Sequence, residues 1–365
     1  MPPLVRVVPF AVMLVLCCCG SADQSARPVI ELSRPLVLSG IGDSVDLVSR
    51  KVVTSSSGFV AAFRDLSPAM GVAVFAPDGH FVNSISRQGG GPGELRAIQS
   101  IGFGPGDSLW VVDAMFSAHL FTPPPYVRYV RTVRFAHAVT GGATRFGFIS
   151  PAIVFGGAKK IGGLPPILTT LDGRTRKLFG KELTAQEAER RSGPVFAVDS
   201  AKLWSAMDDE YTLDLIDGEG RVLKRVSRTV DWFPPRLKTV GFPWQIRPRP
   251  QIVDVAQSAG GALFVLVRRA HRNWKPSSRG SSTAPSRPLT IGSALRFSGD
   301  THLFEYVLEV FNAQTGEFIG TRDLEGTVLG FAAADVLCRA SETQGGSLKL
   351  TLSKISIGSS QRISR

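Results

Sequence analysis

Three aspartates stand at the ends of strand-like runs, and their carboxylates are the groups in this sequence best suited to metal chemistry. Asp65, Asp113 and Asp208 each close or follow a run of mostly apolar residues. Hard cations such as Ca²⁺ prefer oxygen ligands, so three converging carboxylates would form a calcium site. Aspartates at strand ends also accept hydrogen bonds from backbone N–H groups. We therefore keep calcium binding as an alternative and expect no cofactor in the main interpretation.

A second group of residues could bind a ligand through charge and aromatic surface. Its members are Arg236, Trp244, Arg268, Arg272 and Trp274. The first two lie in a segment at 229–250 that contains several Trp, Phe and Pro residues. The last two begin an insertion at 271–301 that is rich in Ser, Pro and Arg. Arginine pairs with carboxylates and phosphates, and indole rings pack against sugars and peptides. The group predicts contact with a protein, peptide or carbohydrate; a solvated insertion is the alternative.

Motifs of nucleophilic and nucleotide chemistry are absent from the sequence. The five His residues show no metal-ligand spacing, and no G-x-S-x-G nucleophile elbow occurs. The glycine-rich stretch at 89–93 lacks the Lys-Ser/Thr ending of a phosphate-binding loop. We expect its glycines to allow a sharp crossover, with Glu94 fixing the crossover to a neighbouring unit of the fold. These absences favour a protein without catalytic activity over an enzyme.

The chain carries a formal charge of +12, which would favour an acidic partner through long-range attraction. Nucleic acid is not the expected partner, because the sequence has no zinc-finger spacing, no aromatic RNA-binding signature and no long basic helix. Hydrophobic residues make up 43% of the chain, and 38 Gly with 24 Pro indicate many tight turns. We expect a monomeric, turn-rich protein with a basic surface.

The first 22 residues, 1–22, have the features of an export signal. Arg6 precedes an apolar run at 7–16 that is too short to span a bilayer, and three consecutive cysteines ending at Cys19 follow it. This arrangement resembles a bacterial lipoprotein signal with Cys19 as the acylated residue. Ordinary cleavage after Ala22 is the alternative and would give a periplasmic or secreted protein. We expect an exported protein that meets the membrane only through its lipid anchor.

Cys338 is the only cysteine that remains after either cleavage. A disulfide within the mature domain is therefore excluded. Because Cys338 ends a mostly apolar run at 332–338, we expect a buried and unreactive thiol rather than a nucleophile.

Turn signals recur along the chain at a regular interval. Asp-Gly pairs, the strongest short hairpin signal, follow strand-like runs at 78–79, 172–173 and 217–218. The glycines of these pairs are separated by 94 and 45 positions. Trp110 and Trp204, also 94 positions apart, stand in similar strands. The repeat unit is therefore about 46 residues, the size of a four-stranded propeller blade.

Strand-like runs at this spacing predict an all-β fold, a six-bladed β-propeller of four-stranded antiparallel blades at 28–357. The last blade lacks a fourth strand, and we expect the N-terminal run at 29–38 to complete it and so remove exposed sheet edges. The strand order places five long links on one face of the disc: 87–97, 136–145, 180–194, 229–250 and 270–302. The other face carries short hairpin turns. Function is expected on the loop-rich face.

Three stretches of the sequence resemble a known family. They are GGGPGELR at 89–96, the strand at 108–113 and VDWFP at 230–234. The chain is similar to bacterial six-bladed β-propeller proteins related to NHL-repeat and TolB-like propellers, many of which look like lipoproteins. The resemblance implies an extracytoplasmic binding or scaffold role, often without catalysis, and the loop-rich basic face is the expected binding surface. It also allows the alternative of a metal-dependent hydrolase of the gluconolactonase type.

Overall fold

The fold is described from a computed structural model of the chain. The described residues are 28–39, 51–64, 71–85, 87–96, 98–113, 117–134, 146–149, 152–155, 167–170, 172, 176–178, 193–199, 202–207, 210–234, 247–275, 303–342 and 348–358. The predicted signal peptide at 1–22, with Cys19, and most of the insertion at 271–301 lie outside them. Within the described part, no helix is long and apolar enough to cross a bilayer.

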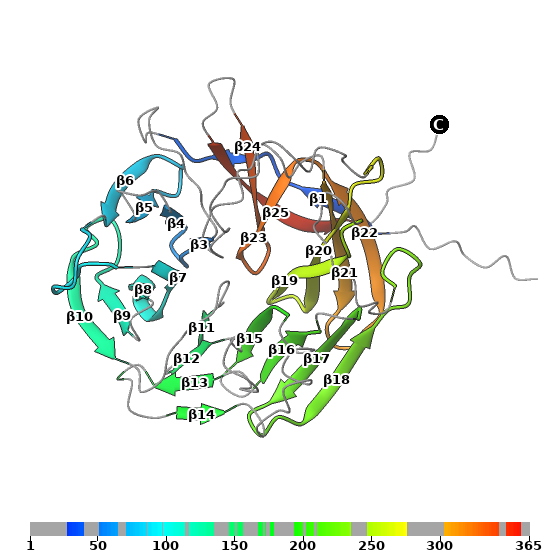
Figure 1. The fold of residues 1–365 in the computed structure, drawn as a ribbon, viewed down its shortest axis with the longest axis horizontal. Helices are drawn as coiled ribbons and strands as arrows, with labels where there is room; N and C mark the ends of the chain where they lie inside the picture. Colours follow the sequence, from blue (N-terminus) through cyan, green and yellow to red (C-terminus); the bar gives the residue numbers. More distant parts are fainter. Residues whose placement is uncertain are drawn as a thin grey trace, which may run out of the picture.

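Five four-stranded antiparallel blades surround a common axis in the described part of the chain (Figure 1). Blade one consists of β3 (Val52–Thr54), β4 (Val60–Arg64), β5 (Gly71–Phe75) and β6 (Phe81–Ile85). Blade two consists of β7 (Ile98–Phe103), β8 (Leu109–Asp113), β9 (Ser117–Phe121) and β10 (Tyr129–Arg134), with the short 3-10 helix η1 (Pro105–Asp107) between β7 and β8. Blade three consists of β11 (Phe146–Ile149), β12 (Ala152–Phe155), β13 (Ile167–Thr170) and β14 (Arg176–Leu178). Blade four consists of β15 (Val195–Asp199), β16 (Lys202–Ala206), β17 (Thr212–Asp217) and β18 (Val222–Ser227). Blade five consists of β19 (Gln251–Gln257), β20 (Ala262–Ala270), β21 (Phe304–Asn312) and β22 (Phe318–Leu324).

The prediction of six four-stranded blades is wrong, because the described strands form five such blades and one sheet of a different composition. This closing sheet has five strands: β23 (Thr327–Ala333), β24 (Val336–Glu342), β25 (Leu348–Gly358), β1 (Val29–Leu32) and β2 (Leu36–Val37). The N-terminal run at 29–38 supplies two of them instead of the expected one. Both pair antiparallel with β25.

Two features explain why the N-terminal run divides. β25 is 11 residues long, so its edge can hold two short strands one after the other. Between them, the Ser33 hydroxyl accepts a hydrogen bond of 2.9 Å from the Lys354 N–H. The first strand is also attached to blade five, where the Arg322 guanidinium donates to the Ile30 carbonyl at 2.6 Å. The N-terminal chain therefore joins the closing sheet to its neighbour.

The innermost strands define the axis of the disc. β3, β7, β11, β15, β19 and β23 lie next to one another in that order, and β23 meets β3. Short turns join first to second strands and third to fourth strands on one face. At one of these turns Gly79 takes a positive φ of 89°, and a Cβ there would stand 2.3 Å from the Val37 carbonyl oxygen. Only glycine fits both requirements, which accounts for the Asp-Gly signal at 78–79.

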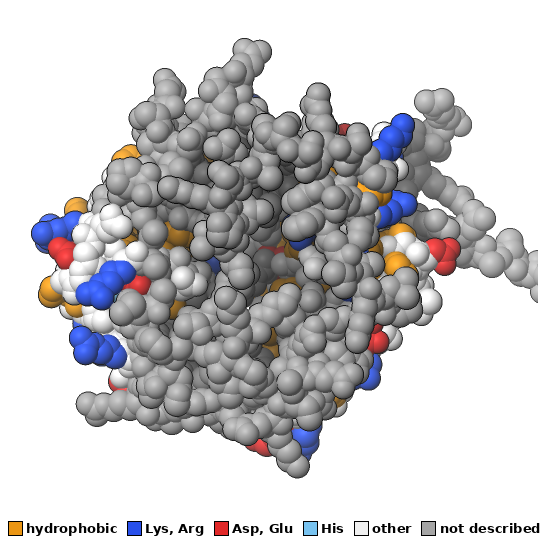
Figure 2. All heavy atoms as spheres, viewed as in Figure 1, with side chains coloured by type: hydrophobic (Ala, Val, Ile, Leu, Met, Phe, Trp, Pro, Cys, Tyr) orange, Lys and Arg blue, Asp and Glu red, His pale blue; other side chains and the backbone are white. Residues whose placement is uncertain are grey.

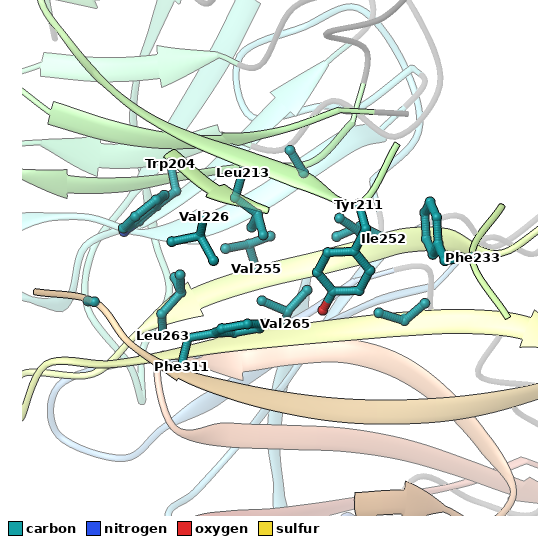
Figure 3. Packing of buried hydrophobic residues seen from close by; sticks show 13 residues of the cluster. Trp204, Tyr211, Leu213, Val226, Phe233, Ile252, Val255, Leu263, Val265 and Phe311 are labelled. Carbon is teal, nitrogen blue, oxygen red and sulfur yellow. The ribbon is translucent and has the colours of Figure 1, made fainter. Parts of the chain in front are cut away.

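The hydrophobic core consists of separate clusters between neighbouring sheets. One cluster lies between blades one and two, one between blades four and five, and two flank the closing sheet. Figure 3 shows the cluster of blades four and five, in which Trp204 and Leu213 face Val255 and Phe311. Trp110 and Trp204, which marked the repeat in the sequence, are among the most deeply buried side chains. Neighbouring sheets are thus joined by apolar packing, and polar groups at their ends can serve other roles.

Candidate functional site

The loop-rich side of blade five carries the described part of the predicted ligand-binding group. Arg268 ends up near the end of β20, and Arg272 and Trp274 follow that strand directly. Arg236 and Trp244 lie outside the described residues. Whether all five form one surface therefore stays a prediction.

Arg268 contacts the first and third strands of its own blade. Its guanidinium donates to the Gln251 side-chain oxygen at 2.8 Å and lies 4.4 Å from the centre of the Phe304 ring. Leu266, which lies two positions earlier in β20, packs in the cluster between blade five and the closing sheet. Because successive strand residues face opposite sides, Arg268 and Arg269 serve different blade interfaces.

Arg269 and Arg272 share two carboxylates in what we call the blade-five ion ladder, made of Arg269, Arg272, Glu305 and Asp323. Arg269 Nε lies 2.7 Å from Glu305 Oε1, and Arg272 Nε lies 3.2 Å from Glu305 Oε2. Both guanidinium groups also reach Asp323, at 3.3 and 3.8 Å. Burial would raise the pKa of Glu305, but hydrogen bonds from the two arginines outweigh it and lower that pKa. The ladder holds two positive and two negative charges, so it is locally neutral.

Trp232 connects the ladder to the link that enters blade five. The Arg269 guanidinium lies 5.2 Å from the centre of the Trp232 ring, within cation–π distance. The next residue, Phe233, is buried in the cluster between blades four and five and stacks edge-on against Tyr211 at 5.2 Å (Figure 3). Phe233 therefore fills space between blades four and five. The roots of the two long links, at Trp232 and Arg272, stand on the same side of blade five.

A buried polar network lies beneath this surface, and no pattern in the sequence indicates it. Glu309 on β21 is 1% exposed, accepts a 2.5 Å hydrogen bond from the Tyr211 hydroxyl and pairs with Arg228. Burial and the neighbouring Glu309 charge raise the pKa of Tyr211 well above its ordinary value. Tyr211 and Arg228 belong to blade four, so the network joins two neighbouring blades through residues that are 98 and 81 positions from Glu309. Acid–base pairs of this kind become visible only when the strands are placed.

Asp113 is the described member of the predicted calcium set. It is 2% exposed, and its Oδ2 accepts a 2.8 Å hydrogen bond from the Arg96 N–H in the link that enters blade two. The same oxygen lies 3.8 Å from His119 Nε2. Among the described residues, no group of three or more His, Cys, Asp or Glu side chains could hold a metal ion. Asp65 and Asp208 lie outside that part of the chain, so the three-aspartate site stays a prediction.

The glycine-rich link differs from expectation in one detail. Among the described residues, the polar contacts of Glu94 lie within its own link: Oε2 accepts a 2.8 Å hydrogen bond from the Gly91 N–H, and Oε1 lies 3.8 Å from Arg87 Nε. Asp113 makes the connection to blade two instead, through Arg96. Gly93 takes a φ of 75° and lies against the Tyr129 ring, where a Cβ would be 3.0 Å away. The two ends of the link lie close together, because the Leu95 N–H donates to the Arg87 carbonyl at 2.8 Å.

Comparison with solved structures identifies the fold. A member of the duf4221 family from Bacteroides vulgatus superposes with a TM-score of 0.64 at 10% identity, over 92% of this chain and 100% of that one. A candidate exported protein from Bacteroides fragilis gives 0.53 at 10% identity, over 92% and 97% of the two chains. No family model and no curated protein matches the sequence, so membership of the NHL-related or TolB-like families is not shown. At this level of identity the similarity establishes the fold alone, and the chain is an all-β propeller.

Proposed function

We propose that this chain is an extracytoplasmic binding or scaffold protein that uses the loop-rich side of blade five. The candidate export signal at 1–22, with lipidation at Cys19, would place it in the cell envelope. The contact residues are Arg268, Arg272 and Trp274 together with Arg236 and Trp244 from the preceding link. The partner is a protein, peptide or carbohydrate.

One observation carries the proposal: the contact between Arg269 and Trp232. It fixes the beginning of the link at 229–250 beside the beginning of the insertion at 270–302. Both links contribute aromatic and basic residues to the predicted group. Two variable segments with a common rigid base are the usual architecture of a binding site on a scaffold.

The ion ladder defines how a partner would bind there. Arg272 remains 65% exposed although it pairs with Glu305 and Asp323. An acidic group of a partner that binds Arg272 would replace its ion pairs with Glu305 and Asp323. Binding would therefore not add an ion pair at an arginine that had none before. Surface ion pairs contribute little net energy, so apolar contacts with the tryptophans would supply most of the affinity.

Site-specific photo-crosslinking in the native cells tests the proposal. A photoreactive residue at Asn273 stands on the loop-rich side of blade five, and the same residue at Gln314 stands on the hairpin side. Both positions are exposed, so they are matched in accessibility. We expect a discrete crosslinked product from position 273 that position 314 does not give. Identical products from both positions, or none from position 273, would contradict the proposed surface.

A Cys19→Ala variant tests the localisation independently. We expect wild-type protein in the membrane fraction with a lipid-modified N-terminus and the variant without that modification. Unmodified wild-type protein with an N-terminus after Ala22 would instead establish ordinary signal cleavage.

A further inference from the structure

The outer strand of blade two, β10, has an open hydrogen-bonding edge. It is the last strand of its sheet, and no described strand pairs with its outer side. Tyr129 and Val130 on this strand are 37% and 50% exposed, and Tyr126 in the preceding turn is 70% exposed. Large apolar side chains beside an unpaired edge are unusual, because such an edge invites another strand to pair with it.

Positive charge surrounds this edge. Arg128, Arg131 and Arg134 are exposed along it. In the described part of the chain, no carboxylate lies within ion-pair distance of Arg128 or Arg134. Arg87 of the adjacent glycine-rich link does not add to this charge, because its Nε lies 3.8 Å from Glu94 Oε1. Figure 2 shows Lys and Arg side chains, with some acidic ones among them, beside hydrophobic side chains at the left rim of the disc, where Figure 1 places β10.

On the other outer strands that can be compared, the arginines are paired with acids, the strand lies next to another strand, or the side chains are at least half-buried. On β18, Arg225 pairs with Asp214 at 2.7 Å, and Arg221 before it pairs with Asp217 at 2.7 Å. β22 lies next to β1, to which Arg322 is bonded. β6 carries only half-buried or buried side chains. Among the outer strands whose side chains are described, β10 therefore combines an open edge and an exposed aromatic side chain with two nearby arginines, Arg128 and Arg134, that have no described carboxylate partner.

The edge is also held in a fixed conformation. The Tyr129 hydroxyl lies 3.0 Å from Thr132 Oγ1, which lies 3.0 Å from Nδ1 of the buried His119. Asn83 of blade one donates to the Tyr126 carbonyl at 3.0 Å. A preorganised edge loses little conformational entropy when it binds.

We propose that β10 binds an acidic, extended segment of a partner protein, which adds a strand to blade two. Backbone hydrogen bonds along the edge would supply affinity, and the arginines would select acidic side chains. Tyr126, Tyr129 and Val130 would cover the apolar positions of the added strand. This surface is separate from the blade-five site, so either proposal can fail without the other.

Fluorescence anisotropy with a synthetic peptide in which Glu alternates with Val tests the proposal on the purified full-length chain. A second peptide carries N-methyl groups on alternate backbone amides, which keeps its charge and side chains but prevents a strand ladder. We expect the first peptide to bind and the methylated one to bind at least about tenfold more weakly. Equal binding of both peptides, or no binding of either, would overturn strand addition.

Charge-reversal variants locate the surface. Arg128→Glu with Arg134→Glu should weaken peptide binding about tenfold or more. The control is Arg34→Glu with Lys349→Glu, which makes the same change in net charge at exposed positions in the closing sheet. An equal loss in the control variant would show non-specific attraction and overturn the location. Sedimentation of the free protein decides the remaining case: a dimer abolished by the β10 variant would assign the edge to a second copy of this chain instead.

Discussion

The carboxylate of Asp107 in η1 joins blades one and two on the face of the short hairpin turns, and its contribution to stability can be measured. Its Oδ1 accepts hydrogen bonds from the Ser56 N–H at 2.9 Å and the Ser56 hydroxyl at 2.7 Å. Its Oδ2 accepts one from the Ser57 N–H at 2.9 Å and another from the Ser57 hydroxyl. Asp107 is 8% exposed, so this cradle connects a turn of blade one to blade two in a largely desolvated place. The perturbation is Asp107→Asn, which keeps the shape and tolerates the positive φ of 57° at this position.

The expected magnitude follows from the pKa of Asp107. Burial raises the pKa, but the hydrogen bonds from Ser57 and Ser56 outweigh it and bring it from 3.8 to about 2. Each unit corresponds to about 1.4 kcal/mol, so the charged form contributes about 2 kcal/mol to folding. Since the folded pKa is depressed, this stability is fully present above about pH 4 and is lost as the pH falls toward 2. The variant should therefore be less stable by about 2 kcal/mol at pH 7 and should approach the wild type near pH 2.

Urea unfolding from pH 7 to pH 2 measures this difference, with tryptophan fluorescence as the signal. Trp110 is 2% exposed and donates to Ser108, directly after η1, so it reports on this region. Because a chain of this size need not unfold in one step, the two proteins are compared at each pH by their midpoints. Asp78→Asn is the control, since that carboxylate accepts one described hydrogen bond within its own exposed turn. A constant offset between Asp107→Asn and wild type across the whole range would refute the reasoning.

Two further predictions concern buried groups. Glu309→Gln removes the charge that pairs with Arg228 and should lower the free energy of unfolding by about 3 kcal/mol in urea titrations, whereas Glu317→Gln on an exposed turn should have little effect. The Cys338 thiol is 1% exposed and burial raises its pKa to about 12, so a disulfide reagent at pH 8 should leave it intact in the folded protein and label it fully in denaturant; rapid labelling without denaturant would contradict the burial.

Local signals in the sequence are sufficient to predict the strands and the turns between them. The Asp-Gly pair at 78–79 works as a signal because Gly79 satisfies two constraints at once, a positive φ and close contact with Val37. Trp110 and Trp204 mark equivalent positions because each is a buried residue in the second strand of its blade. Such features repeat with the blade, so a single sequence reveals their period.

Closure of the ring is less predictable, because it depends on pairing between the two ends of the chain. The run at 29–38 has the apolar character of one strand, and its division depends on the length of β25 and on the contact between Ser33 and Lys354. β25 and Lys354 both lie more than 300 positions from this run in the sequence. The sequence therefore predicts one four-stranded blade too many.

The pairing of basic residues with acidic ones also cannot be predicted from the sequence, and it distinguishes the two proposed surfaces. The sequence assigns a basic character to the blade-five residues, but the fold pairs Arg272 with Glu305 and Asp323, which lie more than 30 positions away. Arg128 and Arg134 have no such partner among the described carboxylates, so a basic surface belongs to the edge of blade two. Salt weakens the ion pairs of the free protein and those of the complex alike, so replacing one pair by another leaves the affinity nearly independent of salt. An ion pair that forms only in the complex makes the affinity fall as salt is added. Binding at β10 should therefore weaken steeply with ionic strength, and binding at blade five should change little, so a salt titration alone assigns a newly found partner to one surface or the other.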